Sequence, residues 1–226
     1  LSSRRQRQMC IRDSISSEAR NEIDLQGKLL IPGLIDDQVH FREPGLTHKG
    51  EIATESKAAI AGGVTSYFEM PNVNPNTSTI ENLEKKFDIA ANKSYANYSF
   101  YLGATNDNIE EIKKSDPNAS CGLKVFMGAS TGDLLVNKYE SLEKIFEHCP
   151  TNIVTHCEDP KRLVENENIF QEKYGDQLHA AHHAVIRDEE CCYLSSSLAV
   201  GLAKRFGANL PVSYTHLTLP TRAQVW

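Results

Sequence analysis

Short apolar segments alternate with longer amphipathic ones between residues 34 and 206, and this order constrains the fold more than any other feature. Strands are expected at 34–40, 64–70, 98–102, 122–127 and 152–156. Helices are expected at 51–61, 78–93, 107–115, 138–149, 158–174 and 188–206. Strands that are separated by helices pair in parallel, so the order predicts a parallel sheet with helices packed on its outside.

Two architectures satisfy this order: an open doubly wound sheet and a closed barrel of eight βα units. Periodicity alone does not choose between them. No GxGxxG or GxxxxGK(S/T) loop follows any of the expected strands, which disfavours an open sheet that binds nucleotides.

The composition is that of an ordinary globular protein, with 40% hydrophobic and 24% charged residues in a chain of 226. The net charge of -6 gives no electrostatic attraction to nucleic acid or anionic membranes, so neither is expected as a partner. No apolar run is long enough to span a bilayer, and we recognise no secretory signal. The six cysteines form no CxxC pair, which fits a reducing, cytoplasmic setting better than a disulfide framework.

Two terminal stretches interrupt the pattern. Residues 1–14 are basic and polar without periodicity, and residues 211–226 begin at a proline and break the preceding pattern. We expect both to be non-native sequence around a partial reading frame; the alternative is a disordered basic leader and a loose tail. The remaining chain is expected to be a short segment over 15–33 that leads into a barrel domain over 34–210.

Side chains with metal-binding and anion-binding chemistry occur where the expected strands end, which is where βα-barrels carry their active sites. The first strand ends at His40 and is followed by Arg42, and the second is followed by Asn72. The fourth strand holds Lys124, and the fifth ends at His156. Together on one rim, these groups would supply metal ligands and a clamp for an anion.

The same residues lie in longer motifs that resemble the barrels of the amidohydrolase superfamily, and dihydroorotases in particular. The motifs are PGLIDDQVHFREPG, AAIAGGVTSYFEMPN, GLKVFMGAS and THCED, in the order that the family has them. The resemblance covers roughly residues 25 to 210. It implies an α/β fold that is an incomplete (β/α)8 TIM barrel, with about five βα units and a remnant of the small N-terminal β segment.

The resemblance also implies one or two zinc ions at the carboxyl ends of the strands. His40 and His156 would be ligands. Lys124 matches the lysine that many members carboxylate with carbon dioxide, which turns a cation into an oxygen ligand. Water activated by the metal would attack a ring amide carbonyl of the substrate.

A substrate clamp is implied by the same motifs. Arg42 and Asn72 match the residues that hold the free carboxylate of the substrate, and a guanidinium meets a carboxylate with two hydrogen bonds. The plainer alternatives are a surface ion pair between Arg42 and Glu43 and a turn role for Asn72.

Two departures from the family pattern bear on activity. The family has His-x-His on the first strand, and Gln38 stands at the first of these positions, where an amide oxygen is a weaker zinc ligand than imidazole. Gln38 is a further candidate ligand if this branch tolerates an amide; otherwise one metal site is weak or absent. The family's histidine on strand six and its general acid-base aspartate on strand eight lie beyond the matched region, and His216 fits neither. The chain as given is therefore expected to be inactive alone.

The resemblance favours dihydroorotase activity, the reversible interconversion of dihydroorotate and N-carbamoyl-L-aspartate in de novo pyrimidine biosynthesis. A hydantoinase or allantoinase is an alternative with the same mechanism, but its substrate gives no reason to keep the arginine clamp. A non-catalytic homologue that serves as a scaffold is a third alternative, supported by Gln38. The expected ligand is a small molecule, and the expected assembly, by resemblance, is a homodimer.

Overall fold

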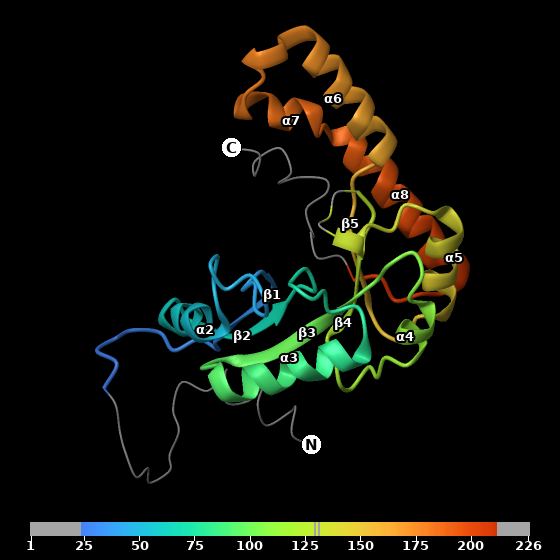
Figure 1. Cartoon of the computed structure of the whole chain (residues 1–226). Helices are drawn as coiled ribbons and strands as arrows, with labels where there is room; N and C mark the ends of the chain where they lie inside the picture. Colours follow the sequence, from blue (N-terminus) through green and yellow to red (C-terminus); the bar gives the residue numbers. More distant parts are fainter. Residues whose placement is uncertain (1–23, 129, 131, 212–226) are drawn as a thin grey trace.

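The structure, a computed structural model, describes residues 24–128, 130 and 132–211. Five strands form a parallel sheet in sequential order (Figure 1). They are β1 (Leu34–Val39), β2 (Val64–Glu69), β3 (Asn97–Gly103), β4 (Gly122–Phe126) and β5 (Ile153–His156). The predicted run of about five βα units in a partial barrel is therefore confirmed. The expectations about residues 1–14 and 212–226 lie outside the described residues.

Helices follow each strand, as the alternation predicts. The first four are α2 (Ile52–Ala61), α3 (Ile80–Lys93), α4 (Ile109–Lys113) and α5 (Tyr139–His148). After β5 come α6 (Pro160–Tyr174), α7 (His183–Ile186) and α8 (Glu189–Phe206). In Figure 1, α6 and α7 project away from the sheet, whereas α8 returns to lie beside α5.

Local chemistry sets several of the helix boundaries. The side chain of Thr79 accepts a hydrogen bond from the Asn82 amide at 3.1 Å and caps α3. The last helix ends at Phe206, as the predicted range 188–206 has it, and Gly207 follows with a φ of +68° that favours glycine.

Two segments differ from expectation. Residues 24–33 form no strand, although the resemblance predicts a remnant of a β segment there, and Leu29 and Leu30 stay 91% and 85% exposed. No strand among the described residues pairs with them. Between α6 and α8 the sequence shows no periodicity, yet this segment folds into the 3-10 turns Gly175–Gln177 and Ala180–His182 and the short helix α7.

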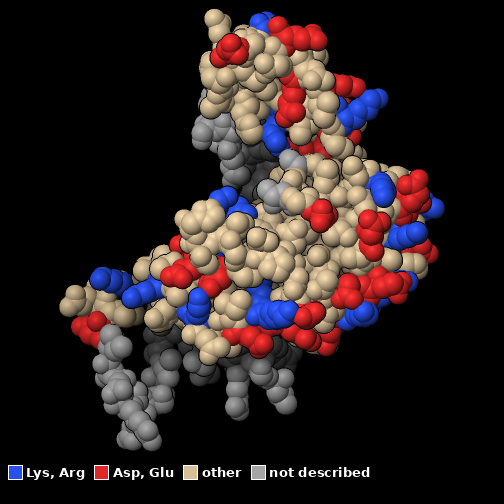
Figure 2. All heavy atoms as spheres, viewed as in Figure 1, with Lys and Arg blue, Asp and Glu red and all other residues tan. Residues whose placement is uncertain are grey.

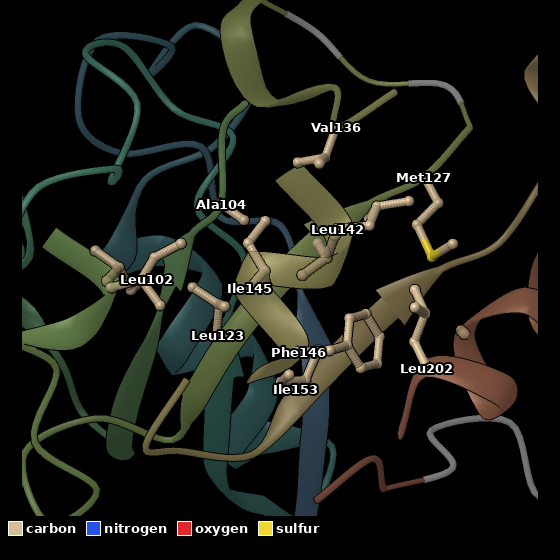
Figure 3. Close-up of a cluster of buried hydrophobic side chains, with 13 residues drawn as sticks. Leu102, Ala104, Leu123, Met127, Val136, Leu142, Ile145, Phe146, Ile153 and Leu202 are labelled. Carbon is tan, nitrogen blue, oxygen red and sulfur yellow. The ribbon is translucent and has the colours of Figure 1, made fainter. Parts of the chain in front are cut away.

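Two buried clusters fill the space between the sheet and its helices. The larger one joins β3, β4 and β5 to α4, α5 and α8 (Figure 3) and consists of Leu102, Ala104, Ile112, Leu123, Val125, Met127, Val136, Leu142, Ile145, Phe146, Ile153, Ala199 and Leu202. The second packs β2 and β3 against α2 and α3 and is built on Phe41, Ile52, Tyr67, Leu83, Ala90, Ala96 and Phe100. Removal of this apolar surface from water holds the helices on one side of the sheet.

The other side of the sheet, called the inner face below, carries the chemistry. Successive side chains of a strand point to opposite faces. Because Leu123 packs in the helix-facing cluster, Lys124 lies on the inner face, and so does Phe126 two residues later. The register pairs Phe126 with His156, so His156 shares that face.

On the face that Figure 2 shows, acidic and basic side chains are interspersed rather than gathered by sign. None of the helices in the described part of the chain combines the length and hydropathy that crossing a membrane requires. The cysteines at positions 121, 149, 157, 191 and 192 are free thiols.

The side chain of Asp188 joins α6 to the start of α8, and its removal tests the fold. The Asp188 carboxylate accepts a hydrogen bond from the Cys191 amide at 3.0 Å, which caps α8, and one from Arg162 Nε of α6 at 2.9 Å. We expect Asp188→Ala to lower the free energy of unfolding by about 1–2 kcal/mol, because it removes a cap and a partly exposed ion pair. Urea unfolding at neutral pH measures the loss.

This stabilisation is expected to depend on pH. The hydrogen bond from Arg162 holds the pKa of Asp188 below its usual range. A carboxyl whose pKa is lowered by folding stabilises the protein above its unfolded pKa, and this contribution is lost as the pH falls below about 4. Substitution of the exposed neighbour, Glu189→Ala, serves as the control. Equal losses of unfolding free energy in the two variants would contradict the stabilising role of Asp188.

Candidate active site

Three predicted site residues lie at the sheet edge where the parallel strands end, and a fourth, Lys124, lies within β4. His40 directly follows β1, Asn72 lies three residues after β2, and His156 is the last residue of β5. Lys124 is the middle residue of β4, so it lies deeper on the inner face than the others. β1 and β5 are the outer strands of the described sheet, so His40 and His156 approach the inner face from opposite sides.

Asn72 connects His40 to Arg42. His40 Nδ1 and Asn72 Oδ1 lie 2.9 Å apart, and Arg42 Nη1 donates to the Asn72 carbonyl oxygen at 3.2 Å. Although His40 is exposed as a whole residue, partial desolvation and then the charges of Arg42 and Lys124 lower the pKa of His40. The neutral imidazole that this favours is the form that binds metals.

Lys124 is a buried amine without a counter-charge in contact. Its side chain belongs to a residue that is 1% exposed, and its Nζ has no hydrogen-bond partner among the described residues. Burial lowers the pKa of Lys124 to about 8. A desolvated amine close to its neutral form is a nucleophile that can add carbon dioxide, and the resulting carbamate has oxygen atoms that bind metal.

His156 is oriented by a carboxylate that the sequence analysis did not single out. Its Nε2 lies 3.0 Å from Oε2 of Glu158, which also accepts a hydrogen bond from Arg187 at 2.5 Å. These two partners, His156 first, lower the pKa of Glu158 to about 2. Metal-binding histidines commonly donate their second ring N–H to a carboxylate, and this contact leaves Nδ1 of His156 as the nitrogen for a metal.

A fully buried ion pair lies behind the loop that carries Arg42. Lys86 Nζ of α3 is 3.1 Å from Glu69 Oε2 at the end of β2, and both side chains are 0% exposed. Burial raises the pKa of Glu69 and lowers the pKa of Lys86, and their mutual attraction opposes both shifts. The other oxygen of Glu69 accepts a hydrogen bond from the Arg42 amide at 3.0 Å.

Glu43 interacts with Ile52 and Lys93 and not with Arg42. Its carboxylate accepts a hydrogen bond from the Ile52 amide at 2.9 Å and pairs with Lys93 at 2.5 Å. The surface ion pair between Arg42 and Glu43, weighed above as the plainer role of the arginine, is therefore not formed.

The residues present fit a metal only with a modified lysine. In the described ranges, no three His, Cys, Asp or Glu side chains converge on one point. The donor set implied by the resemblance instead consists of His40, His156 and a carboxylated Lys124, whose unpartnered amine is the feature that fits it. Gln38 lies half-buried on β1, and its backbone amide donates to Asp36 Oδ1 at 3.1 Å.

Comparison with known proteins agrees with this geometry. Residues 27–122 match the family model described as dihydro-orotase-like. A dihydroorotase of Methanosarcina mazei is 31% identical over 87% of this chain and 42% of its own length. An allantoinase of Streptomyces avermitilis is 32% identical over 84% of this chain and 42% of its own length. The chain thus spans about two fifths of the length of these curated relatives.

Among solved structures, the L-hydantoinase of Arthrobacter aurescens superposes with a TM-score of 0.80 at 26% sequence identity. The match covers 86% of this chain and 44% of the hydantoinase. Sequence and structure therefore agree on a partial barrel with candidate ligands at its strand ends, and this chain belongs to the dihydroorotase-like family of cyclic amidohydrolases.

Proposed function

We propose that this chain carries part of the active site of a metal-dependent cyclic amide hydrolase whose reaction is that of dihydroorotase. The reaction interconverts dihydroorotate and N-carbamoyl-L-aspartate. Its support comes from the dihydro-orotase-like match and from several dihydroorotases among the relatives. The half-buried Arg42 beside Asn72 also suits a substrate that bears a free carboxylate.

The buried Lys124 amine is the observation that carries the metal-dependent chemistry. A buried cation without a hydrogen-bond partner is costly to fold, and the ring of Phe126, 5.3 Å from Nζ, offsets only part of that cost. Carboxylation removes the cation and supplies an anionic oxygen ligand. The structural cost of Lys124 is then offset when a metal is held.

The chain's own residues would have separate tasks. His40, His156 and carboxylated Lys124 would hold one or two zinc ions, with Gln38 as a further candidate ligand. When bound, zinc supplies Lewis acidity and lowers the pKa of water. Arg42 would bind the substrate carboxylate.

Allantoinase or hydantoinase activity is the second candidate. The allantoinase among the relatives and the hydantoinase among the structural neighbours favour it. Neither allantoin nor hydantoin bears a carboxylate, so these substrates leave the position of Arg42 unexplained. A non-catalytic homologue is the third candidate, because Gln38 replaces a histidine of the family pattern.

Further parts of the proposal concern the setting of the reaction. We place it in pyrimidine biosynthesis in the cytoplasm, with a homodimer as the assembly. The absence of electrostatic attraction to nucleic acid and the unpaired cysteines are compatible with this setting.

The activity test uses the gene's complete reading frame, because the chain spans about two fifths of the length of its relatives. The protein is supplied with zinc and bicarbonate and assayed on dihydroorotate, hydantoin and allantoin. Preference for dihydroorotate supports the main proposal, and preference for either other substrate supports the second candidate. Metal uptake without turnover of any of the three identifies a non-catalytic homologue.

Lys124→Met should separate the structural cost of the lysine from its role in metal binding. In metal-free protein at pH 7, we expect the variant to be more stable by about 1–3 kcal/mol, because an unpaired buried cation is removed. The gain should shrink as the pH rises above about 8, since folding lowers the pKa of Lys124 to about 8 and the native amine then becomes neutral. Chemical denaturation at pH 7 and pH 10 measures both effects.

The same variant should lose zinc when the protein is purified with zinc and bicarbonate. Elemental analysis measures the metal content, and the exposed Lys144→Met is the control. Unchanged zinc content in Lys124→Met would show that the lysine is not a ligand.

Arg42→Ala should raise KM for dihydroorotate far more than it changes zinc content. Loss of a charge-assisted bidentate contact costs on the order of 2–4 kcal/mol, or roughly thirtyfold to a thousandfold in kcat/KM. Steady-state kinetics and elemental analysis of the complete protein provide the two measurements. Unchanged kinetics would mean that Arg42 only packs against Asn72.

A further inference from the structure

Arg42 adopts a backbone conformation that its surroundings must hold. Its φ is +70°, in the left-handed region that residues with a Cβ rarely occupy. The residue lies in a loop after β1, and no regular hydrogen-bond ladder fixes it there. Within the loop, the Arg42 carbonyl oxygen accepts a hydrogen bond from the Leu46 amide at 3.1 Å, whereas the Arg42 amide is bound by a group outside the loop.

Glu69 provides that group from the neighbouring strand. Its Oε1 accepts the hydrogen bond from the Arg42 amide at 3.0 Å. The loop that follows β2 also brings Asn72 close. The Asn72 carbonyl oxygen accepts a hydrogen bond from the Arg42 guanidinium at 3.2 Å. Backbone and side chain of the arginine are thus both attached to the end of β2.

Lys86 fixes Glu69 from the opposite side. Its Nζ lies 3.1 Å from Glu69 Oε2, donates to the Met70 carbonyl oxygen at 3.0 Å and lies 5.0 Å from the centre of the Phe100 ring. Both charged side chains are 0% exposed, so water does not compete for the contact between them. The contact is an ion pair without a hydrogen bond to Glu69 Oε2, and it links the carboxylate that binds the Arg42 amide to α3.

We propose that Glu69, held by Lys86, is a positioning residue that fixes Arg42 for binding the carboxylate of the substrate. This inference rests on the proposed function for its substrate. Its physical basis is preorganisation: a guanidinium fixed before binding loses less freedom when the carboxylate arrives. Glu69 itself touches no substrate in this account and acts through Arg42.

Three paired variants of the complete protein test the proposal. Glu69→Leu/Lys86→Met removes both charges and the acceptor without leaving an orphan charge in the interior, which such pairs generally tolerate. Glu69→Gln/Lys86→Met removes both charges but retains an acceptor oxygen for the Arg42 amide. Glu81→Leu/Lys85→Met, which removes an exposed ion pair on the same helix, is the control.

Two readouts are measured for each variant. Hydrogen exchange of the Arg42 amide is compared with exchange of core amides such as that of Leu123, which report global stability. We expect the leucine variant to accelerate Arg42 exchange beyond any change in the core and to raise KM for dihydroorotate by about fivefold to a hundredfold, with kcat much less affected. The glutamine variant should recover most of both effects, and the control should show neither.

The outcomes separate this inference from the proposed function. Native exchange and native KM in the leucine variant would overturn the inference, as would equal effects of leucine and glutamine, which would indicate a general packing role. If the native protein does not turn over dihydroorotate, the proposed function fails. The exchange readout then still decides whether Glu69 holds Arg42.

Discussion

Parallel pairing of the five strands is the constraint on which the rest of the structure depends. All strands run in the same direction, so their carboxyl ends and the loops that follow them share one edge of the sheet. Successive side chains of each strand point alternately to the helix-facing side and to the inner face of the sheet. Leu123 and its neighbours pack against the helices, while Lys124 is placed on the inner face. The candidate site combines the shared direction of the strands with the alternation of side chains along each strand.

Two buried lysines show how differently this fold treats charge. Lys86 is paired with Glu69 and also donates to a backbone carbonyl, so its desolvation is compensated. Lys124 has a similar degree of burial and no hydrogen-bond partner among the described residues. The first arrangement is that of a structural ion pair. In the second, only the ring of Phe126, 5.3 Å from Nζ, faces the buried amine within the described part of the chain, and this contrast is the strongest physical reason to propose chemistry for Lys124.

Much of the fold could be predicted from the sequence because its signals are local. The cap at Thr79 and the terminating Gly207 are read directly from residue type and position. The segment between α6 and α8 could not be predicted, because its turns depend on contacts between side chains. In it, the Ala181 amide donates to the ring of His179, and the ring of His182 stacks on Tyr174.

The candidate site divides in the same way. The positions of its candidate residues at strand ends could be predicted, since the expected strands and the motifs both mark them. The supporting pairs could not, because Glu69 and Lys86 are 17 positions apart and no spacing rule joins them, and Arg187 lies 29 positions from Glu158. The only local signal for Glu158 is its place two residues after His156.

Direct detection of a carbamate on Lys124 tests the central claim most closely. The complete protein is loaded with zinc in 13C-labelled bicarbonate, and its 13C NMR spectrum is recorded beside that of the Lys124→Met variant. We expect a protein-bound carbamate resonance that is present in the native protein and absent from the variant. A native protein that binds zinc without any such resonance would contradict the account, because Lys124 would then be an amine and not a metal ligand.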